Sequence, residues 1–163
     1  MTGLLGEVDL PAPVGQRWFE DYVPGSVVEF GYASLGEAEI VAFAQDYDRQ
    51  KMHTDTVWAA TGPFGGLIAS GLQTMAVCMG LYVDHYISQV ASLASPGMDE
   101  LRWPAPVRPG DRLRIRVTVA QARLSQSKPD RGLVHSQVQG LNQDNTVVLS
   151  FTAMNFFACR PNT

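Results

Sequence analysis

Residues 70–87 constrain the fold of this chain most, because they read as a helix with apolar side chains on nearly every face. Ser70 suits the N-cap position, and Gln73 stands where the partner residue of a capping box is found. The apolar positions in this stretch are Leu72, Met75, Ala76, Val77, Met79, Leu81, Val83 and Ile87. We expect a helix that is apolar all round to be buried all round, and a single amphipathic sheet can surround it only by curling.

The chain beyond this helix supplies residues for such a sheet. Over residues 112–119, apolar side chains alternate with arginines and a threonine, which is the period of a half-buried strand. Turn residues at 125–131 and 142–145 indicate an antiparallel meander. We expect strands at residues 27–32, 99–103, 113–124, 133–141 and 146–157. A long buried helix followed by an antiparallel sheet predicts an α+β fold.

The segment before the central helix is expected to contain two shorter helices. Ser34 and Glu37 have the spacing of a capping box and predict a helix over residues 35–46. A second helix is predicted over residues 55–60, because a Gly-Pro pair follows it. The polar residues 46–54 between them are expected to form a loop.

Size and composition indicate one domain. A chain of 163 residues, of which 45% are hydrophobic and 17% charged, is expected to fold as a single soluble domain. We assign residues 17–159 to it and residues 1–16 to an irregular lead-in. The longest apolar run, residues 75–83, is shorter than the roughly 20 residues that a membrane span needs, and no secretion signal is visible. We therefore expect a cytoplasmic protein that does not contact membranes.

Two further classes of protein are disfavoured. Cys78 and Cys159 lack the spacing of a zinc or redox motif, so we expect two thiols and no metal site. The pI of about 5.2 and the lack of an aromatic-basic motif argue against a nucleic-acid partner.

A candidate site for chemistry lies in the polar segment. Asp48 and His53 could converge there, and histidine can accept or donate a proton near neutral pH, while a carboxylate can orient it or share a water with it. By itself such a pair is a weak signal, and a solvated loop or a helix-capping role explains it more often than catalysis does. Gly71 begins the central helix, where an unpaired backbone N–H suits an oxygen that gains negative charge. Ser70 reads as a helix cap rather than as a nucleophile, because no nucleophile-elbow motif surrounds it.

The ordered motifs along the chain resemble those of the MaoC-like dehydratases, relatives of the (R)-specific enoyl-CoA hydratases. The segments that carry this resemblance are residues 48–55, 64–71 (Phe-Gly-Gly-Leu-Ile-Ala-Ser-Gly), 97–103 (Gly-Met-Asp-Glu-Leu-Arg-Trp) and 106–111 (Pro-Val-Arg-Pro-Gly-Asp). The resemblance implies a hot-dog fold, in which a curved antiparallel β-sheet wraps around a long central α-helix. It also implies a homodimer with an acyl-CoA tunnel at the subunit interface.

The same resemblance implies roles for individual residues. Asp48 and His53 would hold the water that adds to the double bond of an acyl thioester, and the Gly71 N–H would polarise the thioester carbonyl. No cofactor is implied, because CoA enters only as part of the substrate. Many family members have proline between the aspartate and the histidine, where this chain has Arg49, Gln50 and Lys51. The substrate-binding residues that we expect are Trp58, Phe64, Gly66, Ser70 and Trp103.

Three functions remain open from the sequence. The first is a hydro-lyase acting on a 2-enoyl or 3-hydroxyacyl thioester of CoA or an acyl-carrier protein, in fatty acid or related metabolism. The second is a hot-dog thioesterase, many of which use a carboxylate on the central helix, where this chain has only Asp84 near the far end. The third is a non-catalytic protein that binds acyl thioesters.

Overall fold

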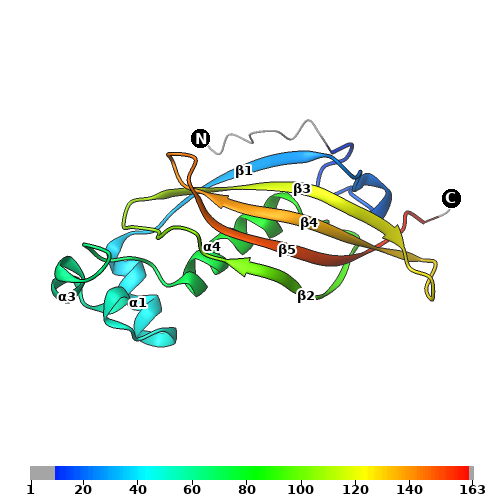
Figure 1. Cartoon of the computed structure of the whole chain (residues 1–163). Helices are drawn as coiled ribbons and strands as arrows, with labels where there is room; N and C mark the ends of the chain where they lie inside the picture. The colour runs from blue at the N-terminus through cyan, green and yellow to red at the C-terminus, as the bar shows by residue number, and fades with distance from the viewer. Residues whose placement is uncertain (1–9, 162–163) are drawn as a thin grey trace.

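Helix α4 (Gly71–His85) and a curved antiparallel sheet dominate the structure, a computed structural model that describes residues 10–161. The five strands lie in the order β1-β3-β4-β5-β2, and every neighbouring pair is antiparallel. Their bounds are β1 (Val27–Ser34), β2 (Ser92–Arg102), β3 (Arg112–Leu124), β4 (Arg131–Leu141) and β5 (Val147–Ala158). The sheet curves along α4 (Figure 1), which confirms the predicted α+β architecture and the meander of β3, β4 and β5.

The alternation predicted for β3 gives the sheet a core face and an outer face. The apolar members are fully buried and join the same core cluster as Cys78 and Tyr82 of α4; they are Leu113, Ile115, Val117 and Val119. On the outer face, Arg114 and Arg116 form ion pairs with Glu29 of the neighbouring strand β1. The strand arginines therefore link two strands.

Helix α4 is buried on one side only, which corrects the expectation that it would be buried all round. Cys78 and Tyr82 face the sheet and are 0% and 1% exposed, whereas Leu72 and Val83 are 52% and 47% exposed. The expectation failed because the sheet curves enough to cover one side of the helix and does not close around it. One apolar side of α4 is consequently left on the surface of the described chain.

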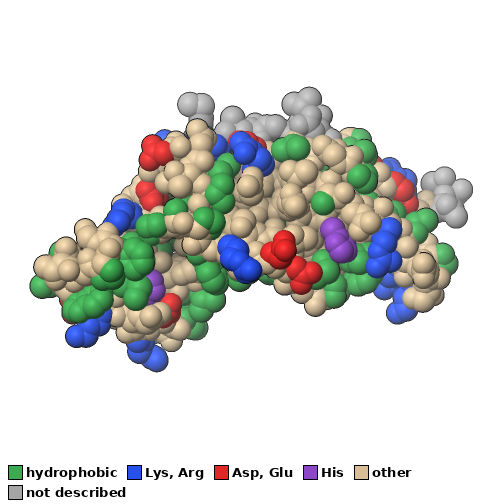
Figure 2. Space-filling view, in the orientation of Figure 1, with side chains coloured by type: hydrophobic (Ala, Val, Ile, Leu, Met, Phe, Trp, Pro, Cys, Tyr) green, Lys and Arg blue, Asp and Glu red, His purple; other side chains and the backbone are tan. Residues whose placement is uncertain are grey.

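The helices before α4 begin at other residues than predicted. Helix α1 (Glu37–Tyr47) cannot be capped by Ser34, which is the last residue of β1. Instead the Gly36 N–H donates to the Glu39 carboxylate at 2.8 Å. Part of the expected loop forms a short helix, α2 (Lys51–Thr54), and α3 (Thr56–Thr61) follows. Helices α1 to α3 form a lobe beyond one end of the sheet (Figure 1), and hydrophobic side chains gather on the lobe's surface (Figure 2).

Strand β2 also begins earlier than predicted, at Ser92 rather than at residue 99. It pairs with β5 across several register shifts, between Ser92 and Ala94, between Ala94 and Gly97, and between Asp99 and Arg102. These bulges remove the period-2 alternation that identifies a strand in a sequence.

Arg17 closes the C-terminal end of α4. Its side chain is buried, and its guanidinium donates to the carbonyl oxygens of Tyr86 and Ala12, both at 2.8 Å. A positive charge is favourable there, because the carbonyl end of a helix carries partial negative charge. Residues 10–18 contain no helix or strand, in keeping with an irregular lead-in, and residues 1–9 of that expected segment lie outside the described residues. Among residues 10–161, no helix has the length and apolar character that a membrane crossing requires.

Candidate active site

Asp48 is the C-cap residue of α1, directly after the last helical residue, Tyr47. Its two carboxylate oxygens have different partners. Oδ1 accepts a hydrogen bond from the Gln50 amide at 2.8 Å, and Oδ2 accepts one from the Ser70 hydroxyl at 2.7 Å. The Gln50 and Ser70 hydrogen bonds, followed by the nearby imidazole of His53, hold the pKa of Asp48 below its usual value of 3.8. Asp48 is therefore a carboxylate at neutral pH.

His53 is buried on the short helix α2, and hydrogen bonding fixes its orientation. Its Nδ1 lies 2.8 Å from the backbone oxygen of Ile68. A carbonyl can only accept, so Nδ1 carries the hydrogen and Nε2 of the neutral ring has a free lone pair. That lone pair faces Oδ2 of Asp48 across 3.4 Å, which is longer than a direct N–H···O hydrogen bond.

The loop convergence predicted for Asp48 and His53 is therefore present, although His53 lies on a short helix rather than on a loop. Two hydrogen-bond acceptors, one carboxylate oxygen and one imidazole nitrogen, point at the same small volume. A water molecule has two hydrogens and can satisfy both acceptors at once. The geometry suits activation of a water by proton transfer to Nε2.

Ser70 connects this pair to the start of α4. Its hydroxyl donates to Asp48 and accepts from the Leu72 N–H at 3.2 Å, which confirms Ser70 as the N-cap of α4. The predicted capping box is wrong, because the Gln73 amide reaches α1 instead and donates to the Glu39 carbonyl oxygen at 3.1 Å. Ser70 thereby fixes the Asp48 carboxylate relative to the first turn of α4.

Gly71 is the first residue of α4, so its N–H has no acceptor within the helix. No hydrogen bond from this N–H is found within residues 10–161. Its neighbour on one side is Trp103, whose indole Nε1–H donates to the Gly71 carbonyl oxygen at 2.8 Å. A donor that the fold leaves free at a helix N-terminus suits an oxygen that acquires negative charge.

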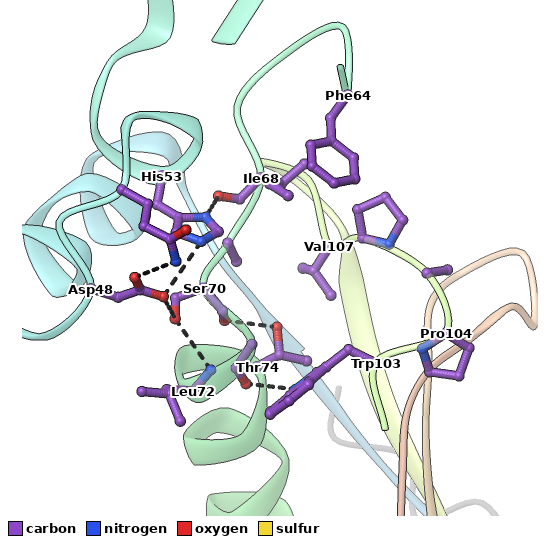
Figure 3. Close-up of a pocket in the computed structure, with 15 residues that line it drawn as sticks. Asp48, His53, Phe64, Ile68, Ser70, Leu72, Thr74, Trp103, Pro104 and Val107 are labelled. Atoms are coloured by element: carbon purple, nitrogen blue, oxygen red, sulfur yellow. Dashed lines mark hydrogen bonds and ion pairs between the residues drawn. The ribbon is translucent and has the colours of Figure 1, made fainter. Parts of the chain in front are cut away.

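These groups border one cavity of about 350 Å³, which Figure 3 shows. Asp48, His53 and Ser70 lie on one side of it, while Trp103 and Pro104 lie on another. The residues that line it are Asp48, Gln50, His53, Phe64, Ile68, Ala69, Ser70, Gly71, Leu72, Thr74, Trp103, Pro104, Ala105, Pro106 and Val107. Acidic, imidazole and apolar groups thus share one cavity that could hold an acyl group.

The expected substrate-binding residues divide into two groups. Phe64, Ser70 and Trp103 line the cavity, whereas Trp58 and Gly66 do not. Trp58 is 38% exposed on α3, where its ring packs near Gly62. Gly66 lies close to the Arg108 guanidinium, on a loop that this arginine holds.

Sequence reasoning missed several lining residues. Gln50 is one of them, since nothing in the sequence indicates that its amide turns back to Asp48. The segment 104–107 forms a wall because the Ala69 N–H donates to the Val107 carbonyl oxygen at 2.8 Å. Arg108 adds a second link by donating to the Phe64 carbonyl oxygen at 2.6 Å. The Pro-Val-Arg-Pro-Gly-Asp motif was the available signal for this wall.

Comparisons with known proteins identify the family of this chain. A family model described as the MaoC like domain matches residues 20–139. Protein MaoC of Klebsiella aerogenes is 31% identical over 135 residues, which are 72% of this chain and 40% of that protein. The 3-hydroxyacyl-thioester dehydratase Z of Mycobacterium tuberculosis is 33% identical over 108 residues, covering 65% of this chain and 66% of that one. The matches therefore span less than two thirds of either relative.

Solved structures extend the comparison to the fold. The crystal structure of a MaoC-like dehydratase from Rhodospirillum rubrum superposes with a TM-score of 0.81 at 36% identity, covering 90% of this chain and 99% of that one. A Mycobacterium tuberculosis protein described as a double hotdog fold superposes with a TM-score of 0.73 at 21% identity, covering 92% of this chain and 46% of that one. The fold of this chain is accordingly a hot-dog fold, as the sequence motifs implied.

Proposed function

Since the chain belongs to the family of MaoC-like dehydratase domains, we propose that it is a hydro-lyase that reversibly hydrates the double bond of a 2-enoyl thioester to a 3-hydroxyacyl thioester. The observation that carries this proposal is the convergence of His53 Nε2 and Asp48 Oδ2, 3.4 Å apart, in the cavity that also contains Gly71. The names of the matched relatives, which include a 3-hydroxyacyl-thioester dehydratase, support the same reaction class.

Hydration would begin with a water bound between the two acceptors. As the water oxygen attacks the β-carbon, Nε2 of His53 takes one of its protons, and the Asp48 carboxylate stabilises the imidazolium. The electrons of the double bond move towards the thioester carbonyl, whose oxygen accepts a hydrogen bond from the Gly71 N–H. The protonated pair then delivers its proton to the α-carbon, and dehydration follows the same steps in reverse.

Hydrogen bonding prepares His53 for this role. Because the Ile68 carbonyl holds the hydrogen on Nδ1, Nε2 of the neutral ring is already a base before substrate arrives. Asp48 is a carboxylate at neutral pH, because its pKa is lowered, and it therefore has no proton to give. When the ring is neutral, the Nε2 lone pair and the carboxylate oxygen are two acceptors for one water.

The substrate that we propose is an acyl-CoA thioester, and CoA would be the only cofactor-like group involved. Aromatic and apolar side chains form the rest of the cavity wall, which suits the acyl part of such a substrate. A thioesterase of the kind that uses a carboxylate on the central helix receives no support, because Asp84 lies at the other end of α4 and outside the cavity.

We also propose that the protein works as a homodimer in the cytoplasm. The exposed apolar side chains Leu72 and Val83 on α4, together with Leu93 and Met98 on the edge strand β2, would be covered by a second copy. Both cysteines, Cys78 and Cys159, are free thiols, which suits a reducing compartment.

A hydration assay with crotonyl-CoA and longer homologues tests the reaction. We expect loss of enoyl absorbance without release of free thiol. Asp48→Asn and His53→Ala should each lower kcat by about 100-fold or more, because each removes one partner in proton transfer. Asp46→Asn, an exposed carboxylate on the same helix, is the matched control and should retain turnover.

Other outcomes would identify another function. Release of free thiol from the wild-type protein would indicate a thioesterase, and binding without either reaction would indicate a non-catalytic acyl-thioester protein. Full turnover in both Asp48→Asn and His53→Ala would remove these residues from the mechanism.

A further inference from the structure

We propose that Trp103 is a positioning residue that fixes the backbone N–H of Gly71 for the thioester oxygen, an inference that rests on the proposed function. The indole lies directly against Gly71. A Cβ atom at this position would stand 2.6 Å from Cε2, 2.9 Å from Cδ2 and 2.9 Å from Nε1 of Trp103. Real Cβ atoms do not approach other atoms so closely, so the indole itself requires glycine at position 71.

Hydrogen bonds fix both peptide groups that flank the Gly71 Cα. On the following side, the Trp103 Nε1–H donates to the Gly71 carbonyl oxygen at 2.8 Å. On the preceding side, the Ser70 carbonyl oxygen accepts from the backbone N–H of Thr74 at 3.0 Å and from its hydroxyl at 3.3 Å. The Gly71 N–H belongs to this second peptide group and is left free to bind an oxygen.

A fixed donor matters for catalysis because the first turn of a helix is the part that frays. A donor that stabilises developing charge is effective only if it is already oriented when the charge appears. Trp103 supplies that orientation from outside the helix, since it belongs to the segment after β2 and is far from α4 in sequence. The aromatic ring also forms part of the cavity wall next to the donor.

The path of the chain brings Trp103 to this place. Strand β2 shifts register between Asp99 and Arg102, and Glu100 within that bulge has a φ of 55°. Bulges beside sites commonly redirect a side chain. After Trp103, the Ala69–Val107 backbone hydrogen bond holds the returning segment against the irregular segment that leads into α4.

Two substitutions separate the roles of the indole. Trp103→Phe keeps an aromatic ring but removes the N–H donor, and Trp103→Ala removes both. With crotonyl-CoA we expect kcat to fall about 10-fold in Trp103→Phe and about 100-fold in Trp103→Ala, approaching the loss of a whole oxyanion donor, with KM within about 3-fold of the wild type. Trp18→Phe, at a tryptophan that does not line the cavity, is the matched control and should retain kcat.

Whether the Trp103 substitutions change kcat or KM distinguishes a positioning role from a binding role for this residue. A rise in KM at unchanged kcat in Trp103→Ala would make Trp103 a wall of the binding site and overturn the proposal. The Gly71 amide resonance in an NMR spectrum gives a readout without substrate, and we expect it to shift in Trp103→Phe but not in Trp18→Phe. An unshifted resonance would likewise overturn the proposal.

A double-mutant cycle in thermal unfolding tests the contact independently of activity. Gly71→Ala should lower Tm in the wild-type background, because its methyl group collides with the indole, and should lower it far less in the Trp103→Ala background. Additive changes in Tm would show that the contact is absent. If the wild-type protein fails to hydrate any enoyl thioester, the proposed function fails, while this cycle still reports whether Trp103 fixes Gly71.

Discussion

Asp48 owes its charge state to neutral neighbours. The amide of Gln50 and the hydroxyl of Ser70 each donate to one carboxylate oxygen, and these two hydrogen bonds lower the pKa of Asp48 more than the nearby His53 does. A carboxylate held in this way stays ionised whether His53 is charged or neutral. It can therefore stabilise the imidazolium during the reaction without first exchanging a proton with it.

Gln50→Ala tests this assignment through stability and pH. Loss of the amide donor should raise the pKa of Asp48 towards 3.8, the usual value for aspartate. A lowered carboxyl pKa stabilises the folded state above the unfolded-state pKa, and that stabilisation is lost as pH falls through the folded-state pKa. The variant should therefore be less stable than the wild type at pH about 7, and the difference should shrink below pH about 3.

The measurement is the free energy of unfolding by urea at both pH values, with an NMR titration of the Asp48 carboxyl carbon. Gln45→Ala, an exposed glutamine on α1, is the control. A stability difference that stays constant between the two pH values would mean that Gln50 acts through something other than the ionised carboxylate.

The main residues of the candidate site were predictable from sequence motifs. Asp48, His53 and Gly71 line one cavity, as their motifs implied, because those motifs lie on segments that the fold must bring to the start of α4. The partners that tune them were not predictable, since a glutamine amide can point in many directions. Trp58 and Gly66 lie near the site in sequence but do not line the cavity, because sequence proximity does not specify which way a residue faces.

At the scale of elements, hydrophobic periodicity predicted the strands that pack against the core, but it did not predict where the helices begin. The strands β3, β4 and β5 were predicted nearly to their ends, because one buried face imposes a period of two. The predicted helix caps were less accurate, since Ser34 and Gly36 both precede acidic residues at suitable spacing and only the end of β1 selects between them. The assignment of residues 17–159 to one domain stays a prediction.

Glu100 is the element-scale position where backbone strain can be tested. Its φ of 55° is in the left-handed region, which a residue other than glycine occupies at a cost of about 1 kcal/mol. Glu100→Gly should therefore raise the free energy of unfolding by up to about 1 kcal/mol. Asp99→Gly, its exposed neighbour without a positive φ, should lower it, because glycine weakens an ordinary strand position.

Urea denaturation of both variants checks this prediction. Equal destabilisation by the two substitutions would mean that Glu100 does not carry the strain. It would also mean that the bulge in β2 is not what directs Trp103 towards Gly71.

At the scale of the whole molecule, the exposed side of α4 is the feature that the sequence pattern misjudged. A helix apolar on all faces was expected to be enclosed by its own sheet, yet Val83 and Leu72 are exposed in the described chain. Hydrophobic periodicity predicts that a helix face is buried. It does not predict whether the same chain or a second chain covers that face.

Val83→Glu tests the proposed homodimer. A charge in an apolar interface must be desolvated without a partner, so the variant should shift the protein from dimer towards monomer. Light scattering coupled to gel filtration at micromolar concentration measures the mass directly. Leu124→Glu, which is also exposed but lies at the end of β3 away from α4, should leave the dimer intact.

A monomeric wild-type protein would contradict the proposal. Equal loss of dimer in both variants would show that added charge, rather than the α4 surface, controls assembly.

The hydrogen bond from the Arg17 guanidinium to the Tyr86 carbonyl oxygen joins residues 69 positions apart. During synthesis Arg17 leaves the ribosome well before Tyr86 does. Its guanidinium must therefore stay hydrated until the C-terminal end of α4 has formed. Burying such a cation early would be unfavourable, since the carbonyl groups that receive it do not yet exist. The final turn of α4 is therefore expected to consolidate late, after contacts of short sequence separation have formed.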